Sequence, residues 1–195
     1  MQLTTTRTIL SAAALVFFAS GLGRAVSTPP EPQDPSPART TPVQRGAYLV
    51  RAMGCNDCHT PWKLGPRGPE PDMSRALSGH PADFVVPPPP KLSGPWTWTA
   101  TATNTAFAGP WGISFTANLT PDLETGLGKW SPETFIATLR TGRHEGKGRP
   151  LLPPMPWPMI RDLTDEDLRA VFAYLQSLPP IRNRVPAPVD PDDQQ

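Results

Sequence analysis

Cysteine is scarce in this sequence: only Cys55 and Cys58 occur among its 195 residues, and they lie three positions apart. Two thiols so close together exclude a framework of cross-linking disulfides. An excess of one charge is also missing, because 18 basic side chains are balanced by 17 acidic ones, and no basic stripe is present. We therefore expect no nucleic-acid partner, and the two cysteines require a local explanation.

Long hydrophobic runs are also nearly absent. The run from Ile9 to Gly23 is shorter than the roughly 20 residues that a membrane-spanning helix needs. Arg7 precedes this run, and small residues up to Ala25 suit a cleavage site. We therefore expect residues 1–25 to be a signal peptide and the protein to be periplasmic. The alternative is that this segment is retained and anchors the protein to the inner membrane.

Proline, in contrast, is abundant, with 29 residues. Residues 26–42 are rich in Pro, Ser and Thr, which predicts a disordered linker, and we expect residues 186–195 to form a flexible tail. Four consecutive prolines from Pro87 exclude a helix within a long Pro/Trp-rich loop insertion at about 61–118. Short pieces of this insertion, such as 112–115, are able to pair as a small hairpin.

Helical signals occur in three places. Residues 43–53 place apolar side chains near one side of a helix. Ser131 is a good N-cap and is followed by Pro132, which suits the first helical position. Thr164 begins a segment with three acidic residues in its first turn and an apolar stripe that ends at Leu178. We therefore expect an all-α domain over residues 43–185, with three to four helices and little or no sheet.

The residues Cys55-Asn56-Asp57-Cys58-His59 match the Cys-X-X-Cys-His motif that attaches haem c. Side chains at i and i+3 project from the same side of a helical turn, so both thiols reach the vinyl groups of one porphyrin. His59 then lies under the ring, where its imidazole is able to bind the iron. The motif predicts one covalent haem c, bound through Cys55, Cys58 and His59.

Two rival interpretations of the same motif are a redox-active dithiol and a zinc site. A dithiol of the thioredoxin kind requires a βαβ context, which the sequence does not show. Zinc requires two further ligands, and without a second cysteine pair only His80 and His144 remain as candidates. Haem attachment therefore explains the motif better than either rival.

A distal ligand for the iron is suggested by Met155, which lies in the segment Leu151-Leu152-Pro153-Pro154-Met155-Pro156-Trp157-Pro158-Met159. Its prolines exclude a helix and reduce the entropy lost when the segment becomes ordered. Met–His ligation would fill the sixth site and raise the reduction potential relative to bis-His ligation. The alternatives are that Met155 only fills apolar space, or that Met159, His144 or His80 is the ligand.

Together these features resemble the bacterial c-type cytochromes, including the cytochrome c subunits of membrane-bound alcohol dehydrogenases. The resemblance covers most of residues 43–185 and rests on four segments: Arg45-Gly46-Ala47-Tyr48-Leu49 before the haem motif, Asn118-Leu119-Thr120-Pro121-Asp122, Thr125-Gly126-Leu127-Gly128-Lys129-Trp130-Ser131, and Met155-Pro156-Trp157 followed by Leu163 to Leu168 and Ala173-Tyr174-Leu175.

The resemblance implies a cytochrome c-like fold around one haem, with Met155 as the distal ligand. It also implies that the first and last helices cross, with Gly46 close to Tyr174. The loop 118–131 would lie near the haem propionates, where Trp130 would be a hydrogen-bond donor. The alcohol dehydrogenase subunits carry three haem motifs, whereas this chain has one.

We therefore expect an electron carrier, not an enzyme. It would accept electrons from a dehydrogenase and pass them to a cytochrome or an oxidase. The alternatives are a haem enzyme, or a redox or gas sensor, and both require a displaceable distal ligand. The sequence identifies neither the donor and acceptor nor a role for His80 and the 61–118 insertion.

Overall fold

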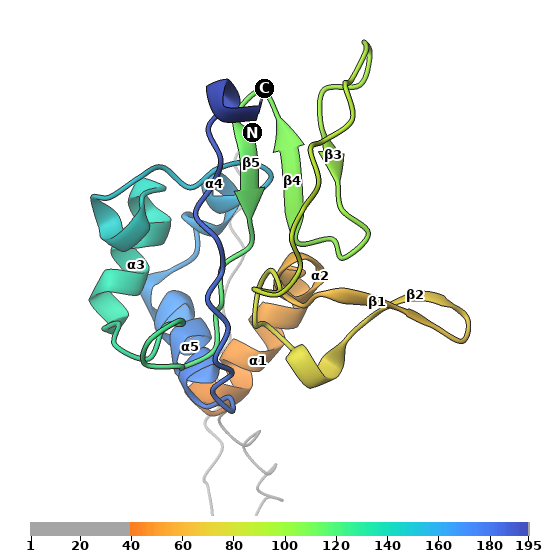
Figure 1. The fold of residues 1–195 in the computed structure, drawn as a ribbon. Coiled ribbons are helices and arrows are strands. Elements are labelled where there is room, and N and C mark those ends of the chain that lie inside the picture. Colours follow the sequence, from red (N-terminus) through yellow and green to blue (C-terminus); the bar gives the residue numbers. More distant parts are fainter. Residues whose placement is uncertain (1–39, 195) are drawn as a thin grey trace, which may run out of the picture. The chain divides into compact units, whose positions relative to one another are not determined.

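The structure, a computed structural model, describes residues 40–194 and contains five α-helices and two small antiparallel sheets (Figure 1). The predicted signal peptide and most of the predicted linker lie outside the described residues. The α-helices are α1 (Pro42–Ala52), α2 (Cys55–His59), α3 (Pro132–Thr141), α4 (Trp157–Ile160) and α5 (Asp165–Gln176), and the short 3-10 helices are η1 (Met73–Arg75), η2 (His144–Gly146) and η3 (Pro191–Gln194).

Capping residues begin the three longer helices, at Ser131 and Thr164 as the sequence predicts and also at Thr41, for which no cap was expected. Thr41 and Gln44 form a reciprocal capping box at the start of α1. Ser131 accepts a hydrogen bond from the backbone of Thr134 at α3, and Thr164 accepts one from the backbone of Asp167 at α5. Each cap binds a backbone N–H group that has no partner within its own helix.

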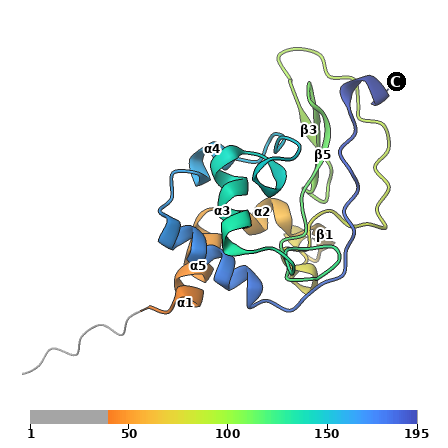
Figure 2. The same cartoon turned by 90° about the vertical axis from the view of Figure 1, so that its left-hand side faces the viewer.

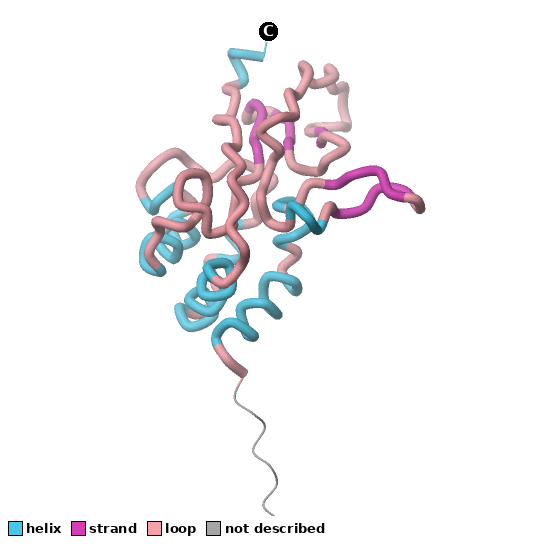
Figure 3. Tube along the Cα trace, turned by 60° about the horizontal axis from the view of Figure 1, so that its bottom comes forward, coloured by secondary structure: helices cyan, strands magenta, loops and turns pink. Residues whose placement is uncertain are grey.

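The expectation of an all-α fold with little or no sheet is wrong. Strands β1 (Trp62–Gly65) and β2 (Gly68–Pro71) form a hairpin that extends away from the helices (Figure 3). Strands β3 (Thr99–Ala100), β4 (Ala106–Gly109) and β5 (Gly112–Phe115) form a second sheet in the order β3-β4-β5. The helical segments are where they were expected, but the insertion is partly sheet.

The physical reason is that prolines weaken strands without excluding them. Pro69 and Pro71 lie in a strand of a two-stranded ribbon, where one edge needs no ladder donors. Strands β4 and β5 contain no proline; Pro110 lies in the two-residue turn between them, with Gly109 and Gly112 as the last pair. The strand expected at 112–115 is present, and it pairs with residues 106–109.

The helices pack around one apolar core on one side of the domain, and strands β3 and β5 lie on the other (Figure 2). The core contains side chains from α1, α3, α4, α5 and the loops between them: Leu49, Val50, Leu77, Leu127, Phe135, Ile136, Leu139, Ile160, Leu168, Val171, Phe172 and Leu175. No helix among residues 40–194 is long and apolar enough to cross a membrane.

Helices α1 and α5 cross at Gly46, as the resemblance implies. A Cβ atom at Gly46 would overlap with the backbone carbonyl of Ala170 and would lie 2.8 Å from Cβ of Tyr174. An ion pair crosses the same contact, with Arg45 Nε 2.8 Å from Asp167 Oδ1. The absence of a side chain at Gly46 therefore sets how closely the two helices approach.

The C-terminal segment, expected as a flexible tail from residue 186, pairs with the three-stranded sheet. Val189 and Ile113 exchange backbone hydrogen bonds of 2.8 and 3.0 Å. In Figure 1 this dark blue segment runs alongside β5 up to η3. The segment thus pairs with β5 at one bridge, and this pairing holds its residues against the domain.

Replacing Gly46 with Ala is expected to lower the free energy of unfolding by about 2–3 kcal/mol, because it overpacks a tight contact between two helices. Chemical denaturation followed by circular dichroism measures the effect. Gly94→Ala is the matched control, since no atom lies within 4 Å of a Cβ at Gly94. Equal stabilities for the two variants would contradict the proposed role of the crossing.

Candidate functional site

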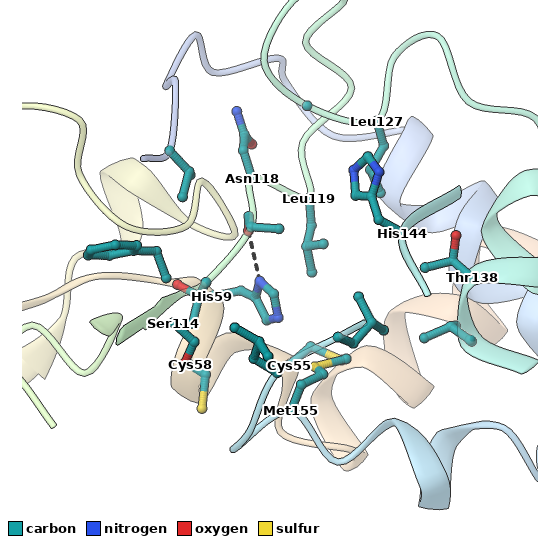
Figure 4. Close-up of a pocket in the computed structure, with 18 of the residues that line it drawn as sticks. Cys55, Cys58, His59, Ser114, Asn118, Leu119, Leu127, Thr138, His144 and Met155 are labelled. Atoms are coloured by element: carbon teal, nitrogen blue, oxygen red, sulfur yellow. Dashed lines mark hydrogen bonds between the residues drawn. The ribbon is translucent and has the colours of Figure 1, made fainter. Parts of the chain in front are cut away.

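A cavity of about 410 Å³ lies between α2, α3, α5, the loop 115–119 and the segment 149–156. Its walls are mainly apolar, and helices α3 and α5 contribute Phe135, Leu139, Val171 and Leu175. Figure 4 shows this cavity with Cys55, His59 and Met155 around it. The cavity therefore brings together residues separated by about a hundred positions in the sequence.

Both cysteines line this cavity from α2, and both thiols are free. Gly54, just before α2, has φ +68°, a left-handed conformation that turns the chain from α1 into α2. Burial raises the pKa of Cys55 to about 11 and also raises the pKa of Cys58. Both thiols are therefore protonated at neutral pH, whereas a reactive dithiol has a lowered pKa.

His59 is buried, and its Nδ1 lies 2.8 Å from the carbonyl oxygen of Ala117 (dashed in Figure 4). Because a carbonyl oxygen only accepts, Nδ1 carries the hydrogen and the neutral ring keeps a lone pair on Nε2. Burial lowers the pKa of His59, which favours this neutral form. An imidazole with Nδ1 bonded and Nε2 available is the form that binds a metal.

Met155 lines the same cavity and is half-buried. The segment 149–156 is attached to the sheet by Ser114, whose Oγ donates a 2.6 Å hydrogen bond to the carbonyl of Pro153. Met159, in α4, is 77% exposed and does not line the cavity. Of the two methionines that the sequence offered, the structure brings only Met155 to His59.

The two other histidines differ in their positions. His80 is fully buried, but both ring nitrogens have protein partners and it does not line the cavity. His144 lines the cavity edge and packs edge-on against Trp130, with ring centroids 5.3 Å apart. Trp130 also lines the cavity, and among the described residues His144 is the only histidine besides His59 that does so.

Sequence reasoning missed several residues that line the cavity. Arg149 and Arg184 contribute two positive charges, and Pro186 and Pro188 come from the C-terminal segment. Single arginines in loops form no recognisable pattern, so no signal in the sequence marks them. The route of the C-terminal segment along β5 brings Arg184 to the cavity.

The residues present fit a covalent haem c. The cavity offers two unpaired thiols on one helical turn, a histidine with a free Nε2, a thioether and an apolar lining. A zinc site fits less well, because residues 40–194 contain no cluster of three or more His, Cys, Asp or Glu side chains.

Comparison with known proteins gives the same answer. The family model for cytochrome c matches residues 43–179. The chain belongs to the cytochrome c family. Covalently bound haem c is therefore its cofactor, and Cys55, Cys58 and His59 fit the attachment motif.

Similar proteins are subunits of dehydrogenases. The cytochrome subunit of fructose dehydrogenase from Gluconobacter japonicus is 28% identical over 168 residues, 86% of this chain and 28% of the relative. The cytochrome c subunit of quinone alcohol dehydrogenase from Gluconobacter oxydans is 29% identical over 132 residues, 68% of this chain and 20% of the relative. The cytochrome c subunit of gluconate 2-dehydrogenase from Pantoea cypripedii is 30% identical over 132 residues, 68% of this chain and 22% of the relative.

This chain thus spans less than a third of the length of these relatives. The family and the relatives identify a haem c domain of the kind found in the cytochrome subunits of dehydrogenases. The expected resemblance to cytochrome subunits of dehydrogenases is confirmed.

Removing both thiols is expected to abolish covalent haem attachment. Protein expressed with a haem-attachment system should keep the added mass of haem after denaturation, and the double variant Cys55→Ala, Cys58→Ala should not. Mass spectrometry of the denatured chains measures this directly. The single variants are the controls, because each keeps one thiol; a double variant that retains covalent haem would contradict the site.

Proposed function

We propose that the chain is an exported carrier of single electrons, with His59 and Met155 as the axial ligands of one haem c. It would accept electrons from a periplasmic dehydrogenase and pass them to a respiratory acceptor, either a cytochrome or an oxidase. The observation that carries this proposal is one cavity lined by both thiols, by Met155 and by His59 with its Nδ1 already bonded. The dehydrogenase subunits among the relatives support the choice of donor.

Each group in the cavity has a separate task. Cys55 and Cys58 hold the cofactor, and the carbonyl of Ala117 fixes the ring of His59 so that Nε2 is presented to the iron. Met155 would be the second protein ligand of the iron, which would leave no coordination position for a substrate. When bound, haem supplies a one-electron iron couple.

The cavity wall supports electron transfer by excluding water. Its apolar side chains replace a mobile polar solvent, so little reorganisation accompanies a change of charge. Arg149 and Arg184 are the cations that would pair with the haem carboxylates, and Trp130 would donate a further hydrogen bond there. We assign the domain that does this to residues 43–185.

Export is supported by the sequence of residues 1–25, which resembles a signal peptide. Haem c attachment through thioethers suits a location outside the cytoplasm, where a loosely held cofactor would be lost. The proposed location is the periplasm, with attachment to the inner membrane if the N-terminal segment is retained.

Replacing Met155 with Ala is expected to remove the near-infrared band of Met–iron ligation in the ferric protein and to lower the reduction potential. The reason is that a thioether ligand favours the reduced state. Absorption spectroscopy and a redox titration measure the two effects. Met159→Ala is the control, because this exposed side chain lies outside the cavity; loss of the band in that variant instead would refute the assignment of Met155.

Carbon monoxide distinguishes a carrier from a haem enzyme or a sensor. With Met155 bound, the ferrous protein is expected to take up no carbon monoxide within minutes at neutral pH. Stopped-flow absorption measures the uptake, and Met155→Ala serves as the positive control because its sixth site is open. Rapid uptake by the wild-type protein would favour the enzyme or the sensor.

A further inference from the structure

The 61–118 insertion closes on itself next to the proximal side of the cavity. Its residues 77–80 run antiparallel to residues 116–119, because the backbone N–H of Leu119 donates to the carbonyl of Leu77 (2.8 Å) and that of His80 donates to the carbonyl of Thr116 (3.0 Å). Residues 77–80 and the C-terminal end of the insertion therefore support each other in a short ladder of backbone hydrogen bonds.

This ladder binds the backbone carbonyl and the ring Nδ1 of His59. The backbone N–H of Gly79 donates to the His59 carbonyl at 2.8 Å, and the Ala117 carbonyl accepts from His59 Nδ1 at 2.8 Å. One bond comes from each strand of the ladder. The position of the Ala117 carbonyl relative to the ring thus depends on how firmly this ladder is held.

The side chain of His80 connects the ladder to the rest of the insertion by two hydrogen bonds. Its Nε2 lies 3.0 Å from the carbonyl of Phe84, so Nε2 carries the hydrogen, and its Nδ1 accepts from the hydroxyl of Thr105 at 2.9 Å. Burial lowers the pKa of His80 and keeps the ring neutral, as both bonds require. The ring also packs against Phe115, with centroids 4.8 Å apart.

Thr105 also binds the backbone of Thr116. The backbone N–H of Thr116 donates to the carbonyl of Thr105 at 2.9 Å, while the carbonyl of Thr116 accepts from the backbone of His80. His80 and Thr105 therefore hold both backbone groups of the residue that precedes Ala117, and their own side chains are bonded to each other. Both residues are fully buried, so water does not compete for these bonds.

We propose that His80 is a positioning residue for the proximal ligand, acting through Thr105 and Thr116 to fix the Ala117 carbonyl that accepts from His59 Nδ1. This inference rests on the axial role of His59 in the proposed function. A firmly held acceptor makes the imidazole a stronger electron donor, which stabilises the oxidised state of a bound iron. His80 would thus keep the reduction potential low without touching the cofactor.

The test is a pair of variants at Thr105. Thr105→Val keeps the shape and removes the hydroxyl that bonds His80, whereas Thr105→Ser keeps the hydroxyl and removes only a methyl group. We expect Thr105→Val to raise the reduction potential. We also expect it to speed hydrogen exchange of the His59 Nδ1 proton by on the order of tenfold, which NMR of the ferrous protein measures. We expect both quantities to stay at their wild-type values in Thr105→Ser.

A second pair at His80 keeps the test informative if Thr105→Val does not fold. His80→Asn retains an acceptor near the position of Nδ1, and His80→Leu retains none. We expect the wild-type protein and His80→Asn to have lower reduction potentials than His80→Leu. We also expect the His59 Nδ1 proton to exchange more slowly in these two proteins than in His80→Leu.

The proposal is overturned if folded variants lacking the His80–Thr105 bond keep the wild-type potential and exchange rate. It is also overturned if Thr105→Ser and His80→Asn change both quantities as much as their partners, since this would be a general loss of packing. The proposed function is checked separately on the wild-type protein: without the NMR signal of an iron-bound His59, the axial role fails and this inference fails with it.

Discussion

The hydrogen bond from His59 Nδ1 to the carbonyl of Ala117 is the interaction on which the haem site depends. It decides which nitrogen of a buried, neutral ring carries the hydrogen, and so which nitrogen is left to bind a metal. A Cys-X-X-Cys-His motif places the ring near the cofactor but does not orient it. The acceptor lies 58 residues further along the chain, at the end of the insertion.

The insertion is therefore part of the site and not only an appended loop. Gly79 within it binds the backbone carbonyl of His59, and Ala117 at its C-terminal end binds the His59 side chain. The insertion also forms the β1–β2 hairpin and the β3–β4–β5 sheet, and β5 in turn anchors the segment that carries Met155 through Ser114. The three-stranded sheet thus connects the side of the cavity that holds His59 with the side that holds Met155.

The C-terminal segment forms part of the cavity wall. Its pairing through Val189 with Ile113 brings Arg184 and two prolines to the cavity wall, next to apolar side chains from the helices. A segment rich in proline cannot supply a full strand ladder, and this segment contacts the sheet at one bridge. It nevertheless contributes residues to the wall of a mainly apolar cavity.

Local chemistry made much of the protein predictable. Helix caps at Ser131 and Thr164, the spacing of Cys55 and Cys58, and the prolines around Met155 act over a few residues, so the sequence alone determined the main helices, the cofactor and a candidate distal ligand. Only the tertiary structure brought Met155 and not Met159 to the cavity wall, oriented His59, buried His80 and formed the sheets. Those outcomes depend on hydrogen bonds and packing between residues far apart in the sequence, for which no local pattern exists.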